Sequence, residues 1–273
     1  MRKKIFLTGS SGFTGKLIAK YLERNNLIVE KIAFNNPKHK RNIKIDLTKK
    51  IYLKKDYNWI IHAASHHKIE DFKTKAKLKG KRNILMVKNL VDFAKNNKVK
   101  NFIFFSTIDL NYAPYPKKKN IYCKSKILCE KLLLNALRKK FLKKLIILRL
   151  PAIVKKQNGN NFIINTLHNL KKDLPINIWN MNDNYNNLIH INDLSKLIFY
   201  FISSKNRRKK IIIDCLSSKP IKLKHLISYL KRKLNSKSKI NYVNKKNKFI
   251  KKKLNSKISY KFYTVKKVIN LLI

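Results

Sequence analysis

The first nineteen residues constrain the fold of this chain more than any other stretch. They read MRKKIFLTGSSGFTGKLIA, in which an apolar strand at residues 4–7 runs into a glycine turn and then into a helical pattern. Gly9 suits the tight turn, Gly12 lets the backbone approach a pyrophosphate, and Gly15 lets the helix pack closely on the strand. The helix that follows presents free N–H groups and the positive end of its dipole to phosphate. Three of the chain's five glycines fall within these seven positions, so the pattern predicts a dinucleotide-binding strand–turn–helix unit.

Length and composition fit one large α/β domain, or such a domain with a smaller lobe. The chain has 273 residues, of which 44% are hydrophobic, enough for a sizeable core. Three widely spaced cysteines match neither a disulfide framework nor a metal site, so we expect no bound metal and a reducing, cytoplasmic location. The basic residues 2–4 precede an apolar stretch too short for a signal peptide, and no apolar run approaches the roughly 20 residues that insert into a membrane.

The formal net charge of +53 would by itself indicate a nucleic acid or an anionic membrane as partner. Lysine is, however, spread over the whole chain, together with many Asn and Ile and few Gly and Pro, a joint bias typical of an AT-rich genome. We therefore expect nonspecific attraction of polyanions and no specific nucleic-acid site. The alternative of a different class is a noncatalytic basic protein that binds RNA or another polyanion.

The second strand, expected at residues 27–33, bears on the choice of cofactor. It ends without the Asp or Glu that would hold the adenosine ribose hydroxyls of NAD, and Phe34 follows it. Lys38, Lys40 and Arg41 come close behind. The missing carboxylate and the nearby cations favour the 2′-phosphate of NADP slightly over NAD.

Tyr122 and Lys126 are the residues with the clearest chemistry. They stand four positions apart on one helical face, so the ammonium can lie near the phenol and lower its pKa from ~10 toward the working pH. Tyr115 and Lys119 repeat this spacing, but they lie among prolines, whereas Tyr122 opens a helix with an apolar face. We therefore assign the acid–base role to Tyr122 and Lys126.

The glycine motif G-x-x-G-x-x-G resembles that of the extended short-chain dehydrogenase/reductase superfamily, also called the NAD-dependent epimerase/dehydratase family. Members of this family act largely on nucleotide sugars. Residues 58–65 (NWIIHAAS) resemble its V-I-H-x-A-A segment, residues 101–107 (NFIFFST) its F-V-x-x-S-S segment, and residues 187–194 (NLIHINDL) its H-V-x-D-L segment. Asn83 stands where the family keeps an asparagine that orders the active-site backbone.

The resemblance implies a doubly wound parallel (Rossmann) sheet with strand order 3-2-1-4-5-6 plus one and a small C-terminal α+β substrate lobe. We expect the NAD(P)-binding domain at residues 1–152, with a return segment at about 188–216. The substrate lobe is expected at residues 153–187 and 217–273. Relatives often pair through two long helices, so we also expect a homodimer through the helices at residues 77–97 and 122–137.

The same resemblance implies the residues of the active site. Tyr122 would exchange a proton with a sugar hydroxyl or carbonyl, Lys126 would bind the nicotinamide ribose and tune Tyr122, and Thr107 would hydrogen-bond the reacting oxygen. The cofactor, NAD or NADP, would contact residues of the glycine turn, of the loop after the third strand and of the strand ends beyond it: Gly9, Ser11, Gly12, Phe13, Thr14, Gly15, Asp46, Leu47, Ala63, Ala64, Tyr122, Lys126 and Pro151.

Two departures from the family pattern bear on the reaction. Ile108 and Asp109 follow Thr107 where nucleotide-sugar dehydratases carry Asp-Glu, which disfavours dehydration. Residues 186–188 read NNL where the best-known epimerases have Arg-Asp-aromatic. These departures, together with a short lobe, favour a 4-keto-sugar reductase or an atypical epimerase that acts on a nucleotide-activated sugar.

Overall fold

The computed structural model describes residues 2–34, 42–66, 76–113, 120–156, 161–204, 207–243, 250–251 and 258–273. Tyr115 and Lys119, and likewise Lys38, Lys40 and Arg41, lie outside the described residues. The chain forms two compact units. The first comprises Met1–Leu150, Ser195–Asp214 and Ile250–Ile258, and the second comprises Pro151–Leu194, Cys215–Phe249 and Ser259–Ile273.

A parallel sheet of seven strands forms the centre of the first unit. Its order is β12-β7-β5-β4-β1-β2-β3, which is the predicted order 3-2-1-4-5-6 plus one, so the doubly wound α/β fold is confirmed. The chain turns back from the β3 edge to β4, which pairs with β1, and ligands of such sheets bind at the carboxyl ends of the strands beside this switch. The strands are β1 (Lys4–Thr8), β2 (Ile28–Ala33), β3 (Asn42–Lys44), β4 (Trp59–His62), β5 (Asn101–Thr107), β7 (Lys144–Leu150) and β12 (Lys210–Asp214).

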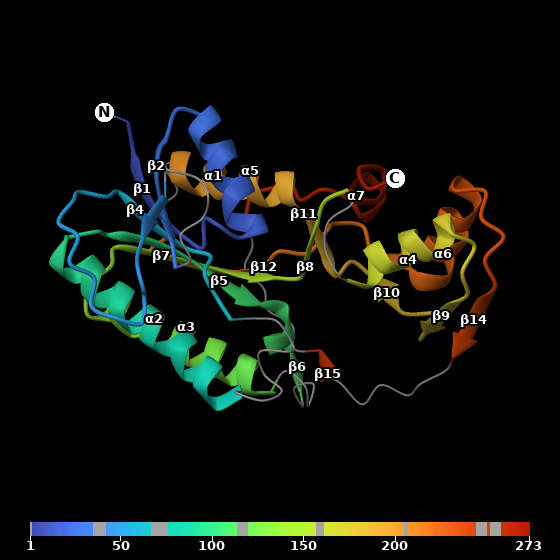
Figure 1. Cartoon of the computed structure of the whole chain (residues 1–273), viewed down its shortest axis with the longest axis horizontal. Coiled ribbons are helices and arrows are strands. Elements are labelled where there is room, and N and C mark those ends of the chain that lie inside the picture. The colour runs from blue at the N-terminus through green and yellow to red at the C-terminus, as the bar shows by residue number, and fades with distance from the viewer. Residues whose placement is uncertain are drawn as a thin grey trace. The chain divides into compact units, whose positions relative to one another are not determined.

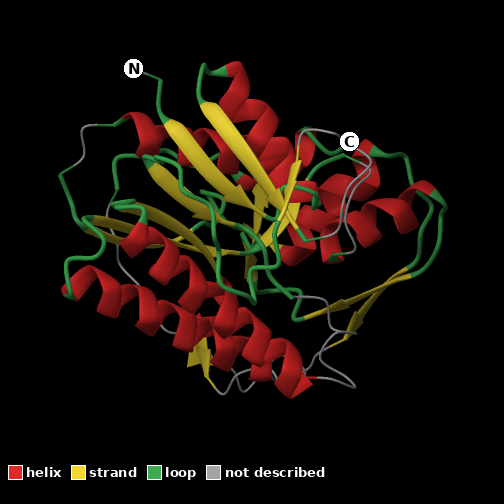
Figure 2. Cartoon of the chain, turned by 60° about the vertical axis from the view of Figure 1, so that its left-hand side comes forward, coloured by secondary structure: helices red, strands yellow, loops and turns green. Residues whose placement is uncertain are grey.

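Helices cover both faces of this sheet (Figure 1). On one face lie α1 (Phe13–Arg24) and α5 (Ile191–Ser203), where the rings of Tyr21 and Phe199 meet edge to face. On the other face α2 (Ala76–Asn96) and α3 (Asn120–Arg138) run side by side, as Figure 2 also shows. A Cβ on Gly80 of α2 would lie 3.0 Å from the side chain of Ile121, so this glycine permits the close approach of the two helices. Their apolar faces and the sheet share one buried core.

Three short elements complete the described part of the first unit. A 3₁₀ turn, η2 (Ile108–Asn111), follows β5 directly and leads into β6 (Tyr112–Ala113). The two-residue strand β15 (Ile250–Lys251) pairs antiparallel with β6. The chain therefore changes direction immediately after Thr107.

The second unit has its own core, to which the described residues contribute three helices and three strand pairs. Asp193 ties together two segments far apart in the sequence, because its carboxylate accepts hydrogen bonds from the Tyr260 hydroxyl at 2.6 Å and the Tyr263 N–H at 2.8 Å. The helices are α4 (Phe162–Lys171), α6 (Leu223–Lys233) and α7 (Val265–Asn270); the pairs are β8 (Ala152–Val154) with β11 (Leu188–His190), β9 (Ile176–Trp179) with β14 (Ile240–Val243), and β10 (Asn184–Tyr185) with β13 (Ile221–Lys222).

No helix within the described ranges is both long enough and apolar enough to cross a membrane.

Candidate active site

The glycine turn between β1 and α1 is fixed by sterics at two of its three glycines. Gly9 has a φ of +72°, and a Cβ there would come within 2.7 Å of the Ala64 nitrogen. A Cβ on Gly15 would lie 2.8 Å from the Gly9 carbonyl carbon and closer still to its oxygen. Ser10 ties the turn to the end of β2, since its N–H and its hydroxyl both donate to the Ile32 carbonyl. The turn is thus pressed between α1 and the backbone of Ala63 and Ala64.

Gly12 is placed differently, and its surroundings fit a dinucleotide pyrophosphate. Its φ is −74°, and among the described residues an added Cβ would meet one atom within 4 Å, the Gly9 oxygen at 3.3 Å. Gly12 is also the N-cap of α1, and no side chain in the described ranges accepts a hydrogen bond there. The backbone N–H groups of Phe13 and Thr14 belong to the first helical turn, whose donors have no partner within the helix. Open space over Gly12 and these uncapped donors form a suitable cradle for a phosphate group.

The loop after β3 is held by hydrogen bonds. The Asp46 carboxylate accepts from the N–H of Thr48 at 2.9 Å and from its hydroxyl at 2.7 Å. Leu47 is buried, and its carbonyl accepts from the side chain of Asn89 on α2. The loop therefore has one defined conformation, and its contact with an adenine stays a prediction.

Thr107, Tyr122 and Lys126 come from β5 and α3, which pack on each other in the first unit. The Lys126 ammonium is buried, donates to the Phe105 carbonyl at 2.8 Å, and lies 4.8 Å from the ring centroid of Phe104. It is 5.7 Å from the ring centroid of Tyr122. Lys126 thus contacts β5 two residues before Thr107. The structure brings Tyr122 and Lys126 together at the carboxyl end of β5.

The pKa of Tyr122 differs from the sequence-based expectation. Burial raises the pKa of this phenol well above its ordinary value; the Asp109 carboxylate adds to this effect, and a hydrogen bond with Ser65 opposes it. We expected Lys126 to lower the pKa toward the working pH. That expectation was wrong for the protein alone, because the loss of water around the phenol has the largest effect on its pKa and raises it. Tyr122 is therefore protonated at neutral pH.

Burial in the interior of the first unit lowers the pKa values of both Lys126 and His62. Burial lowers the pKa of Lys126 to about 8, against the opposing effects of Cys129 and Glu130. Burial and the nearby Lys126 lower the pKa of His62 to about 3, so its ring is neutral. The His62 Nδ1 lies 2.7 Å from the Thr8 hydroxyl, which links the ends of β4 and β1. His62 therefore acts as a packed structural residue.

Asn83 on α2 orders the backbone beside the site, as the resemblance implies. Its side-chain oxygen accepts from the His66 N–H at 2.9 Å, and its amide nitrogen donates to the His66 carbonyl at 3.1 Å. The amide also lies 3.4 Å from the Ser125 hydroxyl, which in turn donates to the Tyr122 carbonyl. One side chain thus connects the segment after β4 with the first turn of α3.

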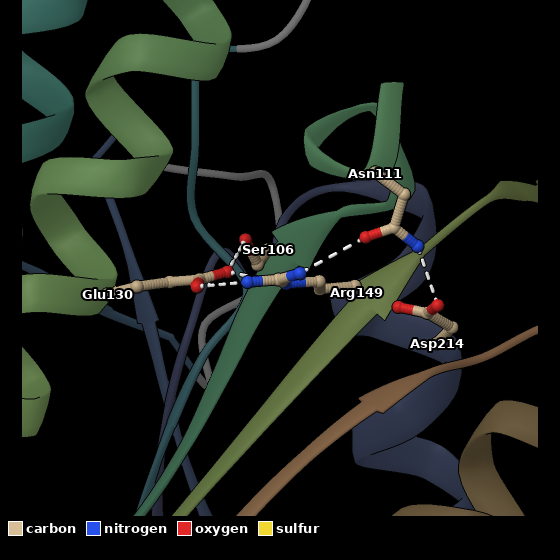
Figure 3. Close-up of polar contacts among 5 residues, drawn as sticks. All are labelled: Ser106, Asn111, Glu130, Arg149 and Asp214. Carbon is tan, nitrogen blue, oxygen red and sulfur yellow. Dashed lines mark hydrogen bonds and ion pairs between the residues drawn. The ribbon is translucent and has the colours of Figure 1, made fainter. Parts of the chain in front are cut away.

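Sequence reasoning missed a cluster of polar residues beneath the site, drawn in Figure 3: Ser106, Asn111, Glu130, Arg149 and Asp214. Glu130 follows Lys126 by four positions, and this helical spacing was a usable signal. Its partners could not be read from the sequence, because they come from three strands and a turn. Pro151, the last residue on the predicted cofactor list, is half-buried at the start of the second unit.

Comparisons with known proteins bear on the fold and the family of the chain. No curated protein sequence matches the chain significantly. Among solved structures, the UDP-N-acetylglucosamine 4-epimerase of Methanobrevibacter ruminantium, in complex with UDP-N-acetylmuramic acid, superposes with a TM-score of 0.78 at 20% identity, over 98% of this chain and 96% of that chain. The UDP-glucose 4-epimerase of Thermotoga maritima with UDP-glucose gives 0.71 at 14% identity, over 98% and 93%.

The UDP-glucose 4-epimerase of Thermus thermophilus, in complex with NAD, gives a TM-score of 0.66 at 14% identity, over 98% of this chain and 92% of that chain. At these identities the superpositions show a shared fold. A family model covers most of the sequence: the model of the NAD dependent epimerase/dehydratase family matches residues 5–214, which include the glycine turn, Tyr122 and Lys126. The chain therefore belongs to the NAD dependent epimerase/dehydratase family.

Proposed function

We propose that this protein is an NAD(P)-dependent enzyme that acts on a nucleotide-activated sugar as a 4-keto-sugar reductase or a 4-epimerase. The observation that carries the proposal is the placement of Tyr122 and Lys126 at the carboxyl end of β5, in the same unit as an uncapped glycine turn. Family membership supports the use of a nicotinamide cofactor. Solved structures of the same fold hold UDP-sugars or NAD, which supports this class of substrate.

Tyr122 is the proton donor of the proposed reaction. The phenol is protonated at neutral pH and can donate to the carbonyl oxygen of a 4-keto sugar, although its raised pKa makes it a weaker acid than a free tyrosine. Thr107 would hydrogen-bond the same oxygen. The Thr107 hydroxyl now donates to the Asp109 carboxylate at 3.0 Å, so it would exchange this partner for the substrate. For an epimerase the phenol must also accept a proton, which requires added positive charge nearby to lower its pKa.

Lys126 and the glycine turn would hold the cofactor. The first-turn N–H groups of α1 would bind the pyrophosphate over Gly12, and the ammonium of Lys126 would bind the nicotinamide ribose. When bound, the nicotinamide supplies or accepts the hydride. We propose NADP over NAD, by a small margin, because β2 ends at Ala33 with Phe34 in place of a carboxylate.

The reaction subclass follows from Asp109. A dehydratase needs an acid and a base directly after the catalytic threonine, but Ile108 is apolar and buried. Asp109 is engaged with Thr107 through both its carboxylate and its N–H. Elimination is therefore disfavoured, and reduction or epimerisation is favoured. We assign recognition of the sugar to the second unit and place the enzyme in the cytoplasm, in keeping with three buried cysteines that form no disulfide in the described part of the chain.

The test is the substitution Tyr122→Phe, which removes a single hydroxyl. We expect folding and cofactor affinity to change little and turnover to fall by about two to four orders of magnitude. The assay follows the absorbance of reduced nicotinamide with nucleotide 4-keto sugars, and product analysis reports epimerisation. Tyr115→Phe is the control, because it belongs to the second YxxxK pair, and it should leave turnover near normal.

Lys126→Met should behave differently from both tyrosine variants. It should weaken cofactor binding and move the pH optimum upward, since the phenol loses a neighbouring positive charge. Full activity of Tyr122→Phe on a verified substrate would refute the mechanism. If no nucleotide sugar reacts, and RNA binding is tight and resists high salt, the noncatalytic alternative replaces this proposal.

A further inference from the structure

Five polar side chains form a continuous hydrogen-bonded cluster beneath the proposed site (Figure 3). The Glu130 carboxylate accepts from the Ser106 hydroxyl at 2.6 Å and from two nitrogens of Arg149, Nε at 3.0 Å and Nη2 at 2.7 Å. Arg149 Nη1 donates to the Asn111 side-chain oxygen at 3.1 Å. The Asn111 amide donates to Asp214 at 2.6 Å. The paired Arg–carboxylate geometry fixes orientation as well as distance.

The cluster spans the carboxyl ends of three adjacent strands. Ser106 on β5 and Asp214 on β12 are both register partners of Arg149 on β7. Asn111 comes from η2 and Glu130 from α3, so each of the five residues belongs to a different element. Ser106 immediately precedes Thr107. The cluster therefore joins α3, which carries Tyr122 and Lys126, to the strand end that carries Thr107.

An ion pair at this depth needs an explanation beyond stability. The side chains of Glu130 and Arg149 are only 8% and 13% exposed. Removing two charges from water costs about as much as their attraction returns, and an apolar pair of similar volume often stabilises a fold equally well. The charges are therefore better explained by what they do to a neighbour than by the stability of the pair itself.

The neighbour is Lys126, one helical turn before Glu130. Residues at this spacing lie on the same face of a helix, and both side chains are buried. The Glu130 carboxylate raises the pKa of Lys126 and so opposes the effect of burial. The other groups around this ammonium are Cys129 and Tyr122 on α3, His62 on β4, the Phe104 ring and the Phe105 carbonyl on β5.

We propose that Glu130 is a positioning residue for the reaction: its carboxylate, held by Arg149 and Ser106, fixes the part of α3 that carries Lys126, and with it the ammonium, against β5. This inference rests on the proposed function for the role of Lys126 toward the cofactor. The charge state of Lys126 can be measured without any cofactor. The two proposals can therefore fail separately.

The test is a carbon-13 NMR titration of lysine side chains between pH 6 and 11 in the cofactor-free protein. Exposed lysines titrate near 10.5, whereas Lys126 should titrate near 8, so its Cε signal moves ahead of the others. A Lys126→Arg sample identifies that signal by its loss. In Glu130→Gln we expect the midpoint to fall by about one pH unit or more, because an opposite charge has been removed.

A second variant separates this effect from loss of structure. Glu130→Gln leaves Arg149 buried without its counter-charge, so the fold itself could suffer. Glu130→Gln/Arg149→Met removes both charges, and we expect its melting temperature to recover toward that of the unaltered protein. Its Lys126 midpoint should lie between those of Glu130→Gln and the unaltered protein, because the repulsion from the Arg149 cation is removed as well. Ser106→Ala is the matched control, since it removes one hydrogen bond to the carboxylate and keeps the charge; its midpoint should stay near 8.

Cofactor affinity gives the second readout. A midpoint lowered from about 8 to about 7 reduces the charged fraction of Lys126 at pH 8 from about one half to roughly one tenth. The affinity for NADPH or NADH should therefore fall about fivefold at pH 8 and change little at pH 6, where Lys126 stays charged in both proteins. An unchanged Lys126 midpoint in Glu130→Gln would overturn the role of Glu130. A lowered midpoint with unchanged cofactor affinity would uphold that role and contradict the proposed contact of Lys126 with the cofactor.

Discussion

Alanine substitutions at Gly12 and Gly15 should separate the needs of the fold from the needs of the cofactor. The two glycines are three positions apart in the same turn, and the same single methyl group is added in each case. At Gly15 the new Cβ would lie 2.8 Å from the Gly9 carbonyl carbon and 3.0 Å from the Ser10 Cα, both backbone atoms that cannot move aside. At Gly12 it would meet a single oxygen at 3.3 Å, which a shift of a few tenths of an ångström relieves.

These contacts set the expected magnitudes. Gly15→Ala forces α1 away from the turn, which we expect to cost about 3 kcal/mol or more of unfolding free energy, at the upper end for overpacking. For a chain of this size that lowers the melting temperature by roughly 6–12 °C. Gly12 has an ordinary φ of −74°, which alanine also adopts. Gly12→Ala lowers the conformational entropy of the unfolded chain, which stabilises the folded state by about 0.4–1 kcal/mol and offsets the tight contact. Its melting temperature should stay within about 3 °C of the unaltered protein.

Cofactor affinity should fall more in Gly12→Ala than in Gly15→Ala, the reverse of the order expected for melting temperature. The methyl group of Gly12→Ala occupies the space that we assign to the pyrophosphate, so the dissociation constant for NADH and NADPH should rise at least about tenfold, or 1.4 kcal/mol. Gly12→Val, with a larger side chain, should abolish binding. Thermal unfolding followed by circular dichroism gives the first quantity, and titration of reduced-nicotinamide fluorescence gives the second. Undiminished binding by Gly12→Val, or an unchanged melting temperature for Gly15→Ala, would refute the reasoning.

Three further predictions concern acid stability, cofactor choice and assembly. Burial lowers the pKa of His62 from 6.5 in the unfolded chain to about 3 in the folded protein, so the stability that its neutral ring contributes is present above pH 6.5 and is lost as the pH falls toward 3. The difference in unfolding free energy between the unaltered protein and His62→Gln, measured by urea titration, should therefore shrink by about 2 kcal/mol between pH 7 and pH 5. NADPH should bind more tightly than NADH, and Arg41→Ala should shrink the preference; tighter binding of NADH by the unaltered protein contradicts this. Leu85 on α2 and Leu128 on α3 are 40% and 45% exposed, and we expect them to pack in the interface of a dimer. Light scattering at high salt should detect this dimer in the unaltered protein and a monomer in Leu85→Lys/Leu128→Lys. A monomeric unaltered protein would argue against pairing.

Local sequence patterns were sufficient to predict the fold class, and the resemblance to a known family supplied the strand order. The glycine turn required a strand before it and a helix after it, and alternating strands and helices then required a parallel sheet. The spacing of Tyr122 and Lys126 likewise placed both on one face of α3. Such features depend on residues close together in the chain.

The electrostatics of the site could not be predicted in the same way. The pKa of Tyr122 depends on how completely other elements exclude water from the phenol, and spacing along one helix does not report that. Arg149 lies 19 positions beyond Glu130 and on a strand, so only the folded sheet brings them together. Likewise α7 begins only at Val265, because the backbone of Tyr263 is hydrogen-bonded to Asp193 and Ser218, both distant in the sequence.

The inward placement of carboxylates such as Glu130 and Asp193 affects how the whole molecule responds to its solvent. The chain has 13 acidic residues against 66 Lys and Arg, and each carboxylate placed in the interior leaves one fewer on the surface to offset those cations. The positive charge of the surface must therefore be neutralised by dissolved anions. Repulsion among like charges disfavours the compact state, and at about 0.1 M salt it is screened beyond roughly 10 Å. Thermal stability and solubility should therefore rise together with ionic strength, and measurements in dilute buffer will understate both.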